Sequence, residues 1–249
     1  MSWARSMVRV INSFVSLLVS LLLIFAGLYA GFALWDNNQI YSAAQDVQIK
    51  MQEIKPVIEE GEEGPSFSEL LAINPDVRAW VTMNGTHIDF PVLQGETNLS
   101  YINTDVYGKF ALAGSIFLDC RNLGDFSENY NLTYGHHMAG GNMYGDLDLY
   151  KDKKFFDENT TGVLMTTNGV YDLKVVALVM VSASEDRIFD VTQNQDTDDV
   201  ITYIMKNATF LGKDMPKVGD EVKFFVLSTC ASEFTDARTI LITTMSEHR

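Results

Sequence analysis

The chain has 249 residues, of which 18 are basic and 33 acidic, so its formal net charge at pH 7 is −15. Such an acidic surface repels phosphates, which argues against nucleic-acid binding. The sequence also contains neither the motif of a phosphate-binding loop nor that of a calcium-binding loop.

The first predicted element is a membrane-spanning helix over residues 10–35, a stretch without a charged side chain. This exceeds the roughly twenty apolar residues that cross a hydrocarbon core of about 30 Å. Arg5 and Arg9 precede the stretch and Asp36 follows it, so the positive-inside rule predicts a cytoplasmic N-terminus over residues 1–9. We therefore expect a single-pass protein of the cell membrane whose folded domain is extracellular.

A cleaved signal peptide is the alternative, because small residues occur between positions 26 and 33. The apolar run is longer than an ordinary signal-peptide core, which favours an uncleaved signal anchor. In both cases the rest of the chain is outside. Without Arg5 and Arg9 it holds 16 basic and 33 acidic residues, a net charge of −17. A solvated acidic surface accounts for this charge, and steering of a basic partner is the other interpretation.

Residues 36–65 predict a juxtamembrane helix followed by a linker. Residues 36–54 are polar with scattered apolar positions, and residues 59–65 combine four glutamates with two glycines and a proline. Glycine and proline break a helix, so the folded domain is expected over residues 66–249.

Short strands dominate the predicted domain. Ser66 and Glu69 have the spacing of a capping box, which predicts one short helix that ends before Pro75. A second helix is predicted at residues 198–206, where it packs on the strands. Strands without regular βαβ alternation, in about 180 residues, indicate one closed or nearly closed barrel. The predicted strands are residues 78–83, 86–92, 115–119, 132–134, 162–167, 170–182, 221–230 and 238–244.

Cys230 stands at the end of the strand at 221–230, and Arg238 opens the return strand. If the two residues pair across the hairpin, their side chains lie about 5 Å apart on one face. A guanidinium there would favour the thiolate and could hold a developing oxyanion. A lone cysteine in a strand is more often a small buried hydrophobic residue, so a nucleophile needs an acid/base partner.

Histidine is the natural partner, and the chain has four of them. His248 lies at the C-terminus, and His87 follows a turn in a predicted hairpin. His136 and His137 remain, at the end of another predicted strand. Adjacent residues of an extended chain point in opposite directions, so only one of the two is expected in a site, and a zinc site shared with Cys230 is disfavoured.

Together these residues resemble the sortases, the Gram-positive cysteine transpeptidases, and specifically class B. The signature is Tyr134-Gly135-His136, then Leu227-Ser228-Thr229-Cys230, then Arg238, in that order. The resemblance covers most of residues 66–249 and implies a mostly β fold, a closed eight-stranded sortase-type β-barrel with short helices. It also implies a helix in the connection at 183–220, beside the substrate groove. Further matching segments are Leu70–Val77, Asp89–Gln94, Gly114–Asp119, Met143–Leu149 and Phe155–Phe156.

The resemblance implies thiol-based acyl transfer without a metal or an organic cofactor. Cys230 would attack a peptide carbonyl in the C-terminal sorting signal of a surface protein or pilin, and His136 would protonate the leaving amine. Arg238 would position the substrate or stabilise the oxyanion. The acyl group would pass to an amine of a cell-wall precursor or to a pilin lysine.

Two positions depart from the family pattern. His137 stands where asparagine usually follows the catalytic histidine, and Glu96-Thr97-Asn98 stands where an aspartate-asparagine pair is common. Asn98 is then the matching substrate-binding candidate. The other substrate-binding candidates are Ser228, Thr229 and Glu233.

Three other functions use the same residues differently. An extracellular cysteine hydrolase or peptidase would release an acid instead of an amide. A catalytically silent surface-binding domain would not use its thiol, and a metal-binding module would use Cys230 as a ligand. Cys120 is the second cysteine, and we interpret it as a structural or half-exposed thiol that does not pair with Cys230.

Overall fold

The computed structural model describes residues 2–57, 66–229 and 237–248. These residues form two compact units, Met1–Ala43 and Ala44–Arg249, which we describe separately. Cys230 and Glu233 lie outside the described residues.

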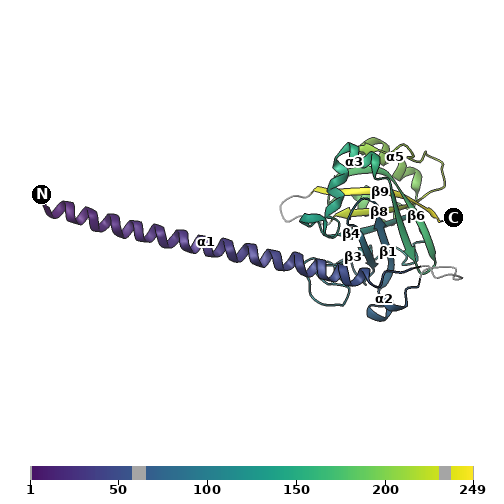
Figure 1. Ribbon diagram of the computed structural model, residues 1–249. Coiled ribbons are helices and arrows are strands. Elements are labelled where there is room, and N and C mark those ends of the chain that lie inside the picture. The colour runs from purple at the N-terminus through teal and green to yellow at the C-terminus, as the bar shows by residue number, and fades with distance from the viewer. Residues whose placement is uncertain (1, 58–65, 230–236, 249) are drawn as a thin grey trace. The chain divides into compact units, whose positions relative to one another are not determined.

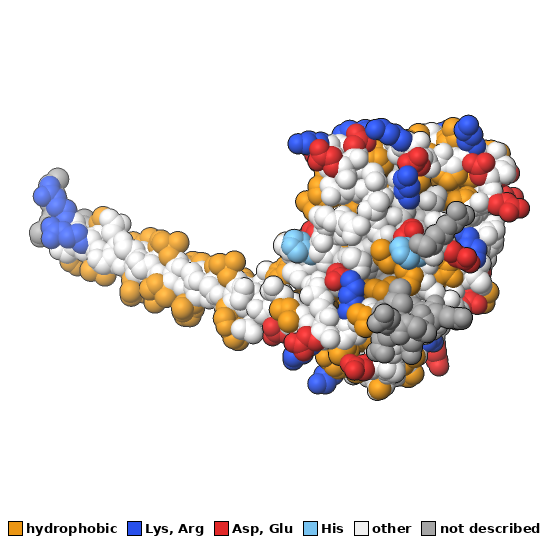
Figure 2. Space-filling model, turned by 45° about the vertical axis from the view of Figure 1, so that its right-hand side comes forward, with side chains coloured by type: hydrophobic (Ala, Val, Ile, Leu, Met, Phe, Trp, Pro, Cys, Tyr) orange, Lys and Arg blue, Asp and Glu red, His pale blue; other side chains and the backbone are white. Residues whose placement is uncertain are grey.

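The first unit is most of the helix α1 (Ser2–Gln52). Its side chains from Val10 to Trp35 are exposed, and hydrophobic side chains cover the helix behind a basic N-terminal end (Figure 2). An apolar window within Arg5–Gln52 has a mean hydropathy of 2.4 and none of it is buried. The helix is therefore a candidate membrane span, as the sequence predicts.

The second unit is a closed β-barrel (Figure 1). In the described residues, eight strands follow each other in the order β5-β1-β2-β3-β4-β8-β9-β6, and pairing of β6 with β5 closes the barrel. The short strand β7 (Phe210–Leu211) is added to β6. The prediction of a closed eight-stranded barrel is thus confirmed. The barrel strands are β1 (Val77–Met83), β2 (Asp89–Leu93), β3 (Ile116–Leu118), β4 (Tyr130–Gly135), β5 (Thr161–Thr166), β6 (Gly169–Ser182), β8 (Lys223–Thr229) and β9 (Ala237–Glu247).

One pairing decides where the candidate site lies. Strands β4 and β8 are parallel neighbours, with Tyr134 beside Ser228 and Gly135 beside Thr229. Because parallel strands run in the same direction, both end at the same edge of the barrel. On the other side of β8, the antiparallel strand β9 places Ile240 opposite Ser228, so β9 begins at this edge.

Helices cover the outside of β4, β6, β8 and β9. The helices α4 (Asp186–Phe189) and α5 (Thr197–Asn207) lie in the connection between β6 and β8. Val200, Ile201 and Ile204 of α5 are buried against a cluster that includes strand residues. The predicted helix at 198–206 is therefore confirmed. Three further short helices are η1 (Ala139–Gly141), η2 (Gly145–Lys151) and α3 (Lys153–Glu158).

The predicted capping box at Ser66 is wrong. The helix α2 (Ser68–Ile73) begins two residues later, after Phe67, and no side chain caps it. The Ser66 hydroxyl instead lies 3.1 Å from that of Ser68. Burial of Phe67 and Leu70 in the cluster around Trp80 determines where this helix begins.

The last turns of α1 belong to the barrel unit. Met51 is buried with Trp80 and Leu93, and the Gln48 amide donates to the His87 carbonyl at 3.0 Å. Beyond the helix, the Lys55 ammonium lies 2.7 Å from the Asp89 carboxylate. The compact unit therefore starts at Ala44, ahead of the segment that the sequence marks as a linker.

Candidate active site

A cavity of about 320 Å³ opens where β4 and β8 end. Four of the predicted site residues line it, namely Asn98, His136, Thr229 and Arg238. They come from the loop after β2, the end of β4, the end of β8 and the start of β9. The remaining lining residues are Ile102, Phe117, Arg121, Tyr134, Ala183 and Phe189.

His136 is half-buried, and its Nε2 lies 2.6 Å from the carbonyl oxygen of Ile102. A carbonyl oxygen only accepts hydrogen bonds, so Nε2 carries a proton in this arrangement. Gly135, which precedes His136, lets the backbone pack closely against Ile116 and Tyr144. A Cβ at this position would collide with both side chains. The ring is thus held at the cavity by its hydrogen bond to the Ile102 carbonyl.

His137 points elsewhere, as the alternation of an extended chain requires. Its Nε2 lies 2.8 Å from the Asp148 carboxylate of η2, and the residue does not line the cavity. The two adjacent histidines therefore have different surroundings. Only His136 shares the cavity with Arg238.

Thr229 and Arg238 form the part of the wall where β8 meets β9. The Thr229 hydroxyl accepts from the backbone N–H of Thr239 at 3.1 Å. Nη1 of Arg238 lies 3.5 Å from the Thr229 carbonyl oxygen. Ser228 is buried, its hydroxyl donates to the same carbonyl, and it does not line the cavity.

Asn98 is held in the cavity wall by two hydrogen bonds. Its amide nitrogen donates to the Asp119 carboxylate at 2.8 Å, and its amide oxygen accepts from the backbone N–H of Cys120 at 2.7 Å. The Cys120 thiol is free and half-buried. Both polar ends of the Asn98 side chain are therefore engaged at the base of the site.

No protein-family profile matches the chain. A solved class B sortase of Streptococcus pyogenes that is involved in pilus biogenesis is 36% identical, with a TM-score of 0.66. That match covers 73% of this chain and 98% of that one. The chain belongs to the class B sortases.

Two further comparisons agree with this assignment. Sortase B of Listeria monocytogenes is 28% identical over 212 residues, which cover 84% of this chain and 85% of that protein. The crystal structure of Staphylococcus aureus sortase B shares the fold, with a TM-score of 0.69 and 24% identity over 86% of this sortase and 100% of that chain.

In this sortase, a buried carboxylate organises the cavity wall, and sequence reasoning missed it. Asp119 has a side chain that is 0% exposed, and Arg121 binds both of its oxygens, at 2.9 and 2.8 Å. The Tyr134 hydroxyl donates to it at 2.9 Å. Burial alone would raise the pKa of Asp119, but the hydrogen bonds from Arg121, Tyr134 and Asn98 hold that pKa below its ordinary value.

The network extends from Asp119 to the helix on the far side of the cavity. Arg121 also donates to the Phe189 carbonyl of α4 at 2.6 Å. The Tyr134 ring stacks on the Phe189 ring with centroids 6.3 Å apart. Burial and the neighbouring Asp119 charge raise the pKa of Tyr134, which keeps its hydroxyl a donor. Asp119 directly follows the apolar run at 116–118, and an acidic residue in that position was the sequence signal available for this network.

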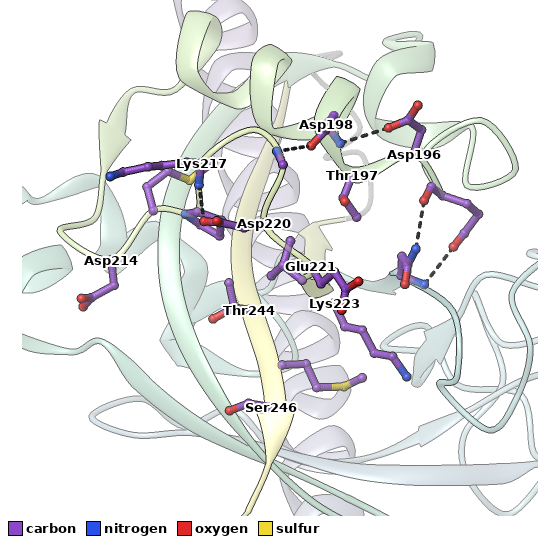
Figure 3. Close-up of a pocket in the computed structure, with 17 residues that line it drawn as sticks. Asp196, Thr197, Asp198, Asp214, Lys217, Asp220, Glu221, Lys223, Thr244 and Ser246 are labelled. Atoms are coloured by element: carbon purple, nitrogen blue, oxygen red, sulfur yellow. Dashed lines mark hydrogen bonds between the residues drawn. The ribbon is translucent and has the colours of Figure 1, made fainter.

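A larger cavity of about 1320 Å³ lies elsewhere on this sortase, beside the start of α5 (Figure 3). None of the predicted site residues within the described part of the chain lines it. Three of its carboxylates are used locally: Asp196 caps α5, Asp198 accepts from the Gly219 N–H at 2.6 Å, and Asp220 accepts from the Lys217 N–H at 2.8 Å. These three carboxylates bind backbone N–H groups, so a structural role explains their presence at this cavity.

Proposed function

We propose that this sortase is a membrane-anchored cysteine transpeptidase with Cys230 as nucleophile, His136 as acid/base and Arg238 as electrostatic partner. The substrate is a protein with a C-terminal sorting signal, and the acceptor is an amine. The supporting observation is the parallel register of β4 and β8, which pairs Gly135 with Thr229. The chain continues from these two residues into His136 and Cys230.

The chemistry has two halves that share one intermediate. The Cys230 thiolate attacks the carbonyl carbon of the scissile peptide bond, and the tetrahedral adduct collapses to a thioester as the C–N bond breaks. With both ring nitrogens protonated, His136 gives one proton to the departing amine and becomes neutral. It then takes a proton from the incoming amine, which attacks the thioester and releases the thiolate.

The lining of the cavity supports the division of roles. The Arg238 guanidinium lies beside the carbonyl of Thr229, the residue that precedes Cys230 in the sequence, and would stabilise an oxyanion formed on the substrate. Asn98 and Thr229 line the cavity and would bind the peptide backbone of the sorting signal. Ser228 is buried away from the lining, so it would support the substrate site only through Thr229.

The anchor would bring enzyme and substrates together. A helix over residues 10–35 with basic residues before it fits a single span with a cytoplasmic N-terminus, and the barrel then stands outside the cell. Both substrates would be met as they emerge from export. The similar Streptococcus pyogenes enzyme is involved in pilus biogenesis, so a pilin lysine deserves a test as acceptor beside a cell-wall precursor amine.

Mass spectrometry of reaction products tests the proposal. The enzyme is incubated with a library of sorting-signal peptides, with and without candidate amines. We expect amide products with the acceptor attached when an amine is present. Release of free acid alone at every amine concentration would favour the hydrolase, and no turnover of any peptide would favour a silent binding domain.

A further inference from the structure

The loop at residues 107–112, which we call the apolar loop, exposes three large side chains on the barrel unit. Phe110 is 77% exposed, Leu112 is 52% exposed and Tyr107 is 38% exposed. Exposed apolar side chains gathered in one short segment mark a contact surface rather than a random feature of a soluble domain.

Hydrogen bonds at the base of the loop hold it in this shape. The Asp105 carboxylate accepts from the backbone N–H groups of Tyr107 and Lys109, at 2.9 and 2.8 Å. Thr104 pairs with Phe110, and Gly108 takes a positive φ of 74° at the turn. The apolar side chains therefore project from a built turn.

The charge of the apolar loop differs from that of the rest of the domain. Asp105 is buried, and the sequence has no acidic residue between Asp105 and Asp119. The only charged side chain of the loop is Lys109, whose ammonium lies 6.0 Å from the centre of the Tyr107 ring. Aromatic, aliphatic and lysine side chains together are typical of the membrane–water interface.

The base of the apolar loop contacts the end of α1. Val106 and Gly114 line a small cavity together with Ala44 and Val47 of that helix. The apolar stretch of α1 ends at Trp35, nine residues before Ala44. Nine residues span about 14 Å as a helix and about 30 Å when fully extended. The surface around Ala44 is therefore tethered close to any bilayer that residues 10–35 cross.

We propose that the apolar loop inserts Phe110 and Leu112 into the lipid interface of the membrane that carries the anchor. The proposal rests on the anchor proposed above. The acidic remainder of the domain is repelled by anionic lipids, so this loop is the surface suited to approach them. Two attachment points fix the orientation of a domain that one helix would leave free to rotate.

The contact would also orient the active site. The same connection between β2 and β3 carries Asn98 and Ile102, which line the cavity, and the Ile102 carbonyl binds His136. The backbone of Tyr101 binds that of Ser115 at 3.0 Å, so the connection closes on itself between the cavity and the apolar loop. Docking of the loop thus sets which way the cavity faces above the membrane.

Fluorescence quenching by lipid tests the proposal on the full chain. Phe110→Trp and, separately, Leu112→Trp are reconstituted into vesicles of phosphatidylglycerol and phosphatidylcholine whose acyl chains carry bromine near the headgroup. Val218→Trp is the matched control, because Val218 is 56% exposed on a loop that lines the larger cavity. The unsubstituted chain reports the anchor, since Trp3 and Trp35 flank the apolar stretch and Trp80 is buried.

We expect brominated lipid to remove most of the emission added by tryptophan at positions 110 and 112, and little of that added at 218. Equal, weak quenching at all three positions while the unsubstituted chain is quenched would overturn the apolar-loop proposal and leave the anchor intact. An unsubstituted chain that escapes quenching would overturn the anchor and, with it, this proposal.

Discussion

The two large cavities of this sortase differ in how their polar side chains are used. In the larger one, beside α5, the carboxylates of Asp196, Asp198 and Asp220 accept hydrogen bonds from nearby backbone N–H groups. In the smaller one, His136, Arg238 and Asn98 come from distant segments and meet at the ends of two parallel strands. A candidate active site is therefore better recognised by different functional groups that meet in one cavity than by the volume of the cavity.

The largest expected effect comes from removing the proposed nucleophile, Cys230. Cys230→Ala should lower the rate of sorting-signal cleavage by at least about a thousandfold, because the proposed thioester forms on this thiol. Peptide cleavage followed by chromatography measures this rate. Cys120→Ala is the matched control and should stay within about twofold of the unsubstituted enzyme, since Cys120 does not line the cavity.

The two adjacent histidines provide the next test. His136→Ala should cost a factor of about 10² to 10⁴, the usual contribution of a general acid/base. His137→Ala should cost less than about threefold, because this ring binds Asp148 outside the cavity. Both are measured as kcat/KM on one peptide. If His137→Ala lost more activity than His136→Ala, the acid/base role would belong to His137. That result would contradict the assignment of the site to the smaller cavity.

Arg238→Lys should lower kcat by roughly ten- to a hundredfold, because lysine lacks the planar, two-pronged donor of a guanidinium. Arg187→Lys on α4 is the control, since Arg187 forms an exposed pair with Asp199 at 3.7 Å. We expect that control to retain its kcat in the same assay. Full activity of Arg238→Lys would reduce Arg238 to a structural residue.

Removing a carboxylate should cost more stability beside the smaller cavity, at Asp119, than in the larger one. Asp119→Asn leaves Arg121 without its charge partner and should lower the free energy of unfolding by about 2 to 4 kcal/mol. Asp220→Asn in the larger cavity should cost less than about 1 kcal/mol, because Asp220 is exposed. Urea unfolding of both variants measures these changes, and equal losses would contradict the difference between the two sites.

The pH dependence of stability gives the smallest effect and the finest test. The folded-state pKa of Asp119 is lower than its unfolded value, so its contribution is complete above the unfolded value, about 3.9. The contribution is lost as the pH falls from there through the folded-state pKa. Between pH 6 and pH 3 the unsubstituted enzyme should therefore lose more stability in urea than Asp119→Asn. Parallel pH curves would show that Asp119 is not held in its charged form.

Much of the fold was predictable because the pattern of hydrophobic residues indicates where strands and helices form. The barrel strands and the helix near residues 198–206 follow from apolar alternation and periodicity. The start of α2 did not follow, because burial of Phe67 overrode the local capping signal at Ser66.

The site was predictable to a smaller extent. Motif order pointed to His136 and Arg238, and the divergence of His137 follows from the geometry of a strand. The contacts of Asp119 with Arg121 and of His136 with the Ile102 carbonyl depend on tertiary packing. Every residue has a backbone carbonyl, so the sequence does not indicate which one binds His136.

The most direct test of the central claim is to locate the acyl intermediate. The enzyme is mixed with a cleavable sorting-signal peptide without an amine, quenched in acid, digested and mapped by mass spectrometry. The account predicts one thioester, on Cys230, that accumulates in the unsubstituted enzyme and is absent from His136→Ala at the same time point. An adduct on Cys120, or cleavage with no adduct on Cys230, would contradict it.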